Sequence, residues 1–115
     1  MLPIKASIGR RGQLSFNYTA FRSMGQPEAV HLLFDPVNSL IGLKPVYPST
    51  PDAHPIRSRL INGTYHFSIR AKEFCNYYGI STKQAIRFRH IEPFDDGTLV
   101  LYLDPSTKYF RRADI

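Results

Sequence analysis

Cysteine is almost absent from this chain of 115 residues. Cys75 is the only one, so no disulfide can form within the chain. It lies in a helix-like stretch, where a lone cysteine is more often a small buried apolar residue than a nucleophile. Hydrophobic residues make up 43% of the sequence, which is enough for one core.

Long apolar runs are also missing. No stretch is long enough to span a membrane, and no signal-peptide pattern is present. We therefore expect a cytoplasmic protein that does not act at a membrane.

The patterns that carry catalysis or metal binding are missing as well. The chain has no glycine-rich phosphate loop, no nucleophile elbow and no paired acid and base. Asp95-Asp96-Gly97 is more typical of a turn than of a carboxylate pair. The histidines have no metal-ligand spacing, and they are His31, His54, His66 and His90. We expect no enzyme activity, and hence no catalytic residue, metal, cofactor or small-molecule substrate.

Acidic residues are few, and their distribution is uneven. Asp and Glu number 9 against 15 Lys and Arg, for a formal charge of +6. Residues 1–30 carry four basic side chains and one acid, and residues 57–90 carry seven and one. Such asymmetry fits a polyanionic partner, most simply nucleic acid. A solvated surface that keeps the protein soluble is the alternative explanation.

Two stretches of the chain share one pattern, GQLSFNYTAFRSMG at 12–25 and GTYHFSIRAKEFCNYYG at 63–79. Each begins at a glycine, alternates like a strand, crosses a short helix-like stretch and ends at a glycine. Leu14-Ser15-Phe16 aligns with Phe67-Ser68-Ile69. The flanking alternating segments complete the order β-β-α-β-β in both halves, so we infer an internal duplication.

The expected boundaries follow from this duplication. Residues 1–46 form the first unit, with strands over 4–9, 13–17, 29–35 and 40–46 and a helix over 18–24. Residues 47–55 are a proline-rich linker. Residues 56–104 form the second unit, with strands over 56–61, 64–69, 84–92 and 98–104 and a helix over 71–78, and residues 105–115 are a C-terminal tail. Each unit alone is too small for a stable core, so we expect the two to share one.

The glycine–strand–helix–glycine segment resembles the swapped-hairpin unit of the AbrB family, and "AKEF" at 71–74 is similar to the Pro-Lys-Glu-Leu helix start of that family. In the family two units interlock their hairpins, and in its MraZ branch one chain supplies both. The resemblance implies a mainly β fold with two short helices, in which tandem β-β-α-β-β units form one pseudo-two-fold, AbrB-like barrel.

The resemblance also implies a function, that of a transcriptional regulator that binds double-stranded DNA. Family contacts come from the first hairpin and the following helix of each unit. Carried over by position, the DNA-binding residues are Lys5, Arg10, Arg11, Arg22, Arg57, Arg59, Arg70 and Lys72. The forked guanidinium of arginine suits phosphates and guanine edges. The same charges also fit ordinary outward residues of edge strands.

The alternative function is a protein–protein interaction module on the same fold, antitoxin-like or a scaffold, without DNA binding. Homo-oligomerisation is left open.

Two further expectations concern individual β-strands. Arg87 and Arg89 alternate with apolar residues on the third strand of the second unit, which the resemblance places away from the DNA face. We expect them to pair with Glu92 or with the acids at 95–96. The alternation of Tyr65, Phe67 and Ile69 predicts a stripe that faces the core.

Overall fold

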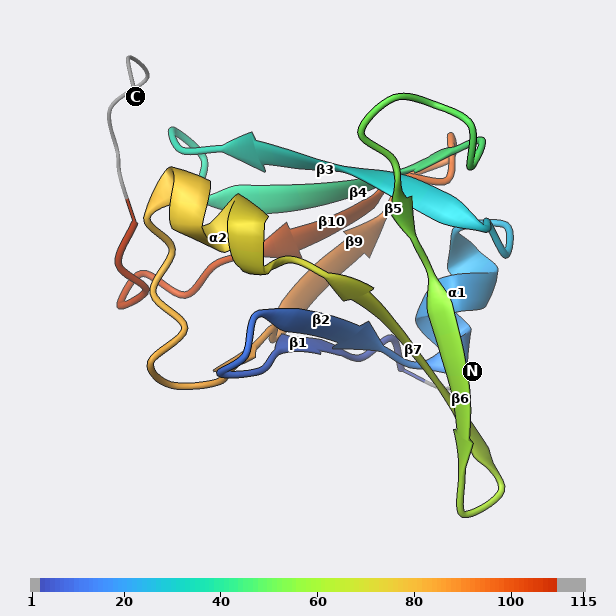
Figure 1. Ribbon diagram of the computed structural model, residues 1–115. Coiled ribbons are helices and arrows are strands. Elements are labelled where there is room, and N and C mark those ends of the chain that lie inside the picture. The colour runs from blue at the N-terminus through green and yellow to red at the C-terminus, as the bar shows by residue number, and fades with distance from the viewer. Residues whose placement is uncertain (1–2, 110–115) are drawn as a thin grey trace.

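Two antiparallel five-stranded sheets make up the fold of this protein, a computed structural model that describes residues 3–109. The lower sheet in Figure 1 has the order β6-β7-β2-β1-β8. Its strands are β1 (Ala6–Ile8), β2 (Gln13–Phe16), β6 (Arg57–Ile61), β7 (Thr64–Arg70) and β8 (Ile86–Arg87). The upper sheet has the order β5-β3-β4-β10-β9. Its strands are β3 (Ala29–Asp35), β4 (Leu40–Val46), β5 (His54–Pro55), β9 (His90–Pro93) and β10 (Leu99–Tyr102). The prediction of a mainly β fold is thereby confirmed.

Two short helices lie at opposite ends of the sheets (Figure 1). They are α1 (Tyr18–Ser23), which follows β2, and α2 (Lys72–Tyr78), which follows β7. The first begins at Asn17, whose side-chain oxygen accepts a hydrogen bond from the Ala20 backbone N–H at 3.0 Å. The second ends at Gly79 in the left-handed conformation, φ 69°, where glycine carries no steric penalty.

Asn17 also fastens the start of the chain, because its Oδ1 accepts from the Lys5 N–H at 3.1 Å and its Nδ2 donates to the Pro3 carbonyl at 2.9 Å. We expect Asn17→Ala to lower the free energy of unfolding by about 1–2 kcal/mol, since it removes a helix cap together with two long-range bonds. Asn17→Asp keeps the accepting oxygen and loses the donor, so it should cost less. Urea denaturation measures both, and equal losses in the two variants would contradict the capping role.

Strands from both halves of the chain lie at the centre of each sheet. In the lower sheet β2 pairs with β7, with Leu14 opposite Ile69, Ser15 opposite Ser68 and Phe16 opposite Phe67. In the upper sheet β4 pairs with β10, with Leu40 opposite Tyr102 and Leu43 opposite Leu99. Neither sheet is therefore complete with the strands of one half alone.

The core lies between the two sheets and is apolar throughout. Side chains from β1, β2 and β7 meet those from β4 and β10, and its fully buried large residues are Ile8, Leu14, Val30, Ile41, Leu43, Ile69, Cys75, Leu99 and Leu101. No buried polar or charged residue occurs within residues 3–109. Burial raises the pKa of the Cys75 thiol to about 11, so it is an inert part of the core, as the sequence predicts.

Three sequence expectations differ from the structure. The strand expected over 84–92 is broken, because β8 joins the lower sheet and β9 the upper one, with the buried Phe88 between them. The last two residues of the expected linker form β5, which pairs with Ala29 and Val30. Tyr65 is 55% exposed, so only Phe67 and Ile69 of the predicted core stripe are buried. The expected tail lies within the described residues only as far as Tyr109.

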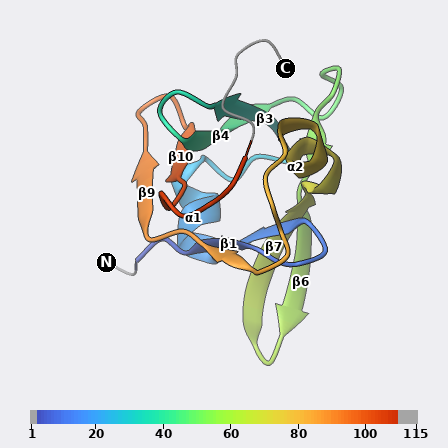
Figure 2. The ribbon, with the colours of Figure 1, turned by 90° about the vertical axis from the view of Figure 1, so that its left-hand side faces the viewer.

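Tyr65 is exposed because the β6–β7 hairpin extends beyond the body of the protein (Figures 1 and 2). Asn62 and Gly63 form its turn with φ of 50° and 79°, as expected for the two-residue turn that the Asn-Gly pair predicts. All five residues of β6 are exposed. The alternation of apolar and polar residues shows to which face of a strand a side chain points. It does not show whether the strand extends beyond the sheet that packs against that face.

Candidate nucleic-acid interface

One row of side chains crosses the whole lower sheet on the side that faces away from the core. Directly paired residues of antiparallel strands point to the same side of a sheet. The pairings of the five strands give the row Arg57, Ser68, Ser15, Ser7, Arg87 in spatial order. Three small hydroxyl side chains thus lie between two arginines. Four strand spacings separate the ends of the row, a distance of about 19 Å.

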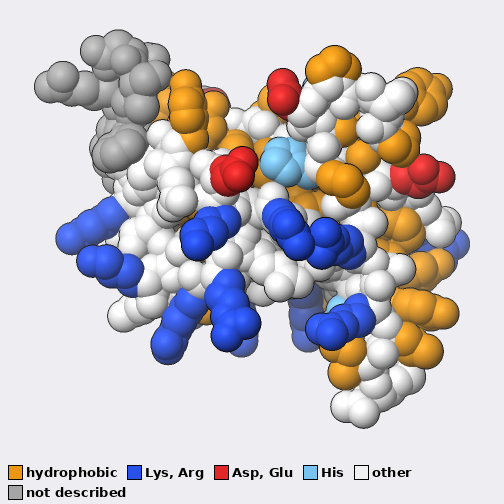
Figure 3. Space-filling model, in the orientation of Figure 1, with side chains coloured by type: hydrophobic (Ala, Val, Ile, Leu, Met, Phe, Trp, Pro, Cys, Tyr) orange, Lys and Arg blue, Asp and Glu red, His pale blue; other side chains and the backbone are white. Residues whose placement is uncertain are grey.

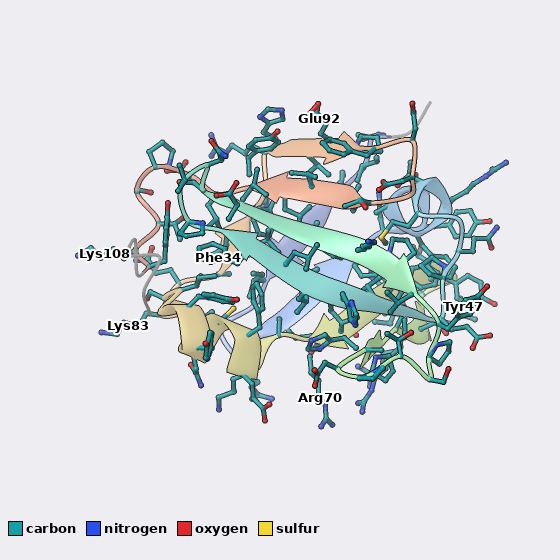
Figure 4. All side chains as sticks on the ribbon, turned by 90° about the horizontal axis from the view of Figure 1, so that it is seen from above. Phe34, Tyr47, Arg70, Lys83, Glu92 and Lys108 are labelled. Carbon is teal, nitrogen blue, oxygen red and sulfur yellow. The ribbon has the colours of Figure 1, made fainter. Side chains whose placement is uncertain are left out.

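The rows beside this one add further basic groups. Residues two positions along a strand share its face, which places Arg59, Arg70 and Lys5 with the row. Lys5 precedes β1 and continues its alternation. We name this surface the basic face, and its cations are Lys5, Arg57, Arg59, Arg70 and Arg87, all exposed. Figure 3 shows Lys and Arg side chains gathered over the lower half of the molecule, and Figure 4 shows Arg70 pointing away from the body.

Part of the basic face is hollowed. Four cations line this hollow, Arg11, Arg57, Arg70 and Lys72, together with the polar side chains of Gln13 and Ser68. Arg11 comes from the first half of the chain and the other three cations from the second. No acidic residue is among the described residues that line it. Gathering four positive charges without an acid makes a site suited to a phosphate or another polyanionic group.

The hollow exists because the turn before β2 packs tightly against the start of α2. The Ala71 backbone N–H donates to the Gly12 carbonyl at 2.8 Å. A Cβ on Gly12 would lie 2.6 Å from the Cα of Lys72, a distance that no side chain tolerates. Glycine at position 12 therefore allows Arg11 and Lys72 to lie beside each other.

The eight residues that the resemblance assigns to DNA binding do not all lie together in the structure. Arg11, Arg57, Arg70 and Lys72 come together in the hollow, and Lys5 and Arg59 lie on the same face. Arg10 lines a different depression, which Cys75, Gly79 and Lys83 also border. Arg22 lies in the last turn of α1, outside the sheet, at the end of the molecule opposite α2 (Figure 1).

Sequence reasoning missed Arg87. The expectation that it lies away from the basic face is wrong, because β8 pairs with β1 and sets Arg87 opposite Ser7. The strand is two residues long, and its own alternation fits either sheet. Only the pairing of β8 with β1, a contact between distant parts of the chain, shows on which face of the sheet Arg87 lies.

Arg89 does not pair with the acids expected for it. It lies near Asp104, whose pKa is below its usual range, first because the Ser106 backbone N–H and hydroxyl donate to it and further because of the positive charge of Arg89. Glu92 instead accepts a hydrogen bond from the Tyr102 hydroxyl at 3.0 Å. Figure 4 shows Glu92 on the side of the molecule opposite Arg70.

The positions of the basic face that the register defines carry no Phe, Tyr or Trp side chain. Besides the cations they are Ser7, Gln13, Ser15, Ile61, Thr64, His66 and Ser68. Single strands are typically bound by stacking bases on aromatic rings. The face therefore offers charge and hydrogen-bond donors for a nucleic-acid backbone and no platform for unpaired bases.

Residues 3–109 contain neither a metal-binding cluster nor a membrane-spanning helix. No three His, Cys, Asp or Glu side chains there converge in a way that could hold a metal ion. In the same range, no helix has the length and the apolar character needed to cross a membrane.

Comparison of the chain with models of protein families, with characterised proteins and with solved structures finds no significant match.

Proposed function

We propose that this protein is a cytoplasmic transcriptional regulator that binds double-stranded DNA through the basic face. The observation that carries the proposal is the row in which two arginines flank three serines. Small serines let a duplex approach the sheet closely. Arginines about 19 Å apart are spaced to contact phosphates on the two sides of a major groove about 12 Å wide.

The same proposal includes the fold type. A swapped-hairpin barrel of two tandem AbrB-like units would pair the second strand of one unit with that of the other, and likewise the fourth strands. The β2–β7 and β4–β10 pairings agree with this arrangement. The registers support it too. In the alignment of the two halves Leu14 corresponds to Phe67, and Phe16 corresponds to Ile69. A two-fold exchange of the halves therefore converts the pair Leu14–Ile69 into the pair Phe67–Phe16, and both pairs occur in the β2–β7 ladder.

The test is the salt dependence of binding to a labelled mixed-sequence duplex, measured by fluorescence anisotropy. Each neutralised phosphate contributes about −0.9 to the slope of log K against log salt. We expect Arg57→Ala/Arg70→Ala to flatten the slope by about two units, and Arg87→Ala by about one.

Lys44→Ala is the control for these variants. Lys44 is exposed on β4 of the other sheet, so its removal should leave the slope unchanged. A single strand of the same sequence should bind more weakly than the duplex, because the face lacks Phe, Tyr and Trp side chains. Absence of duplex binding at low salt would overturn the proposal in favour of the protein-interaction alternative, and equal losses with Lys44→Ala would mean that binding has no fixed face.

A further inference from the structure

Within residues 3–109, no strand pairs with the outer edge of β6. β6 is the last strand of its sheet, and among the described strands it pairs only with β7. Because the Asn62-Gly63 turn has two residues, Ile61 and Thr64 close the hairpin, and the ladder bonds to β7 come from Arg57, Arg59 and Ile61. The backbone N–H and C=O groups of Ser58 and Leu60 consequently point to the free edge. Such groups are a template for an added strand.

The two sides of this edge differ in chemistry. On one side Arg57 and Arg59 belong to the basic face. On the other side Leu60 is 60% exposed and lies opposite Tyr65. An open apolar groove continues from there between the hairpin and α1, and it is lined by Tyr18, Phe21, Pro27, Ile56, Tyr65 and Phe67 among others. Its one charged lining residue within the described chain is Glu28.

We propose that this edge binds an extended, acidic segment of a partner protein by strand addition, with acidic and apolar residues alternating along the segment. Successive residues of an added strand point to opposite sides of the sheet. Acidic side chains would then lie over Arg57 and Arg59, while the apolar ones would cover Leu60 and enter the groove. Backbone bonds to Ser58 and Leu60 supply the affinity, and the alternation supplies the specificity.

Charge decides against a second copy of this chain as the occupant. Two β6 strands paired antiparallel would bring Arg57 and Arg59 of one copy against the same residues of the other. Like charges across a strand pair are destabilising, and charged edges deter self-association. An acidic segment turns the same positions into favourable pairs. Since Arg57 also lines the basic hollow, the partner and any polyanion bound there would compete for it.

The test uses three synthetic peptides of seven residues and the full-length protein. One peptide alternates Glu and Val, a second has the same composition in two blocks, and a third alternates Lys and Val. Binding is followed by two-dimensional NMR of the backbone amides. We expect the alternating acidic peptide to slow the hydrogen exchange of the Ser58 and Leu60 amides and to bind at least about tenfold tighter than the other two. Equal binding of the block peptide would reduce the interaction to charge alone and overturn the proposal, as would no binding at all.

Two variants check where the peptide binds. Ser58→Pro removes an edge N–H without removing a ladder bond to β7, so it should weaken binding about tenfold, whereas Ser58→Ala should leave it within about twofold. Leu60→Glu changes an exposed side chain and should also weaken binding, which keeps the test sharp if the proline variant fails to fold. Unchanged binding in a folded Ser58→Pro protein, or in Leu60→Glu, would overturn the proposal. None of these results depends on duplex binding.

Discussion

Fragments 1–49 and 50–115 are expected to be unfolded when separate and to fold when mixed in equal amounts. Each sheet has a strand from either half at its centre, so a separated fragment lacks one of the two neighbours of its central strands, β2 and β4 in the first fragment or β7 and β10 in the second. The first fragment would expose Leu14, Ile41 and Leu43, which are fully buried in the intact protein. Chains of this size are marginal even with a complete core. Far-UV circular dichroism and amide dispersion should show structure only in the mixture.

The cut falls in an exposed loop, so the cut itself should cost little. Ser49 is exposed, and the cut precedes β5, which stays with the second fragment. A first fragment that carries Leu14→Asp is the matched control, because a charge facing Ile69 at the centre of the sheet should prevent complementation. Cooperative melting of either fragment alone would show that the halves have separate cores and would contradict the shared core.

Much of the fold could be predicted because it depends on residues that are close together in the sequence. The Asn-Gly turn, the alternation in 64–69 and the glycines after both helices each depend on a few neighbouring residues. The order β-β-α-β-β could be predicted for the first half for the same reason, whereas the second half has β8 and β9 where one strand was expected. The shared outward face of Arg57 and Arg59 follows from the two-residue period of a strand and agrees with the register.

The features that sequence reasoning missed depend on contacts between distant residues. Nothing in the residues around Arg87 indicates that β8 leaves its expected strand to pair with β1. Tyr65 follows the core alternation, yet the hairpin carries it beyond the layer that would cover it. The sequence therefore predicted part of the candidate site, because four of the eight assigned residues line one hollow. That the basic face also includes Arg87 follows only from the order of the strands in the sheet.

Gly12 and Gly63 are a matched pair of positions at which substitution by alanine should lower the free energy of unfolding by different amounts. Both precede the second strand of a hairpin and both have φ +79°, so alanine at either meets the same backbone strain, which costs about 1–2 kcal/mol. Their surroundings differ. A Cβ on Gly63 would meet nothing within 4 Å, whereas one on Gly12 would lie 2.6 Å from both the Cα and the Cβ of Lys72.

We therefore expect Gly63→Ala to lower the free energy of unfolding by about 1–2 kcal/mol, and Gly12→Ala to lower it by about 3–5 kcal/mol, since backbone atoms must move to relieve the overlap. Urea denaturation of both variants gives the difference between them, which isolates the contact of the first turn with α2 from the strain that they share. Equal losses would mean that this contact yields easily. A larger loss at Gly12 ties the stability of the whole fold to the contact that sets Arg11 beside Lys72, so the basic hollow and the joining of the two halves depend on the same glycine.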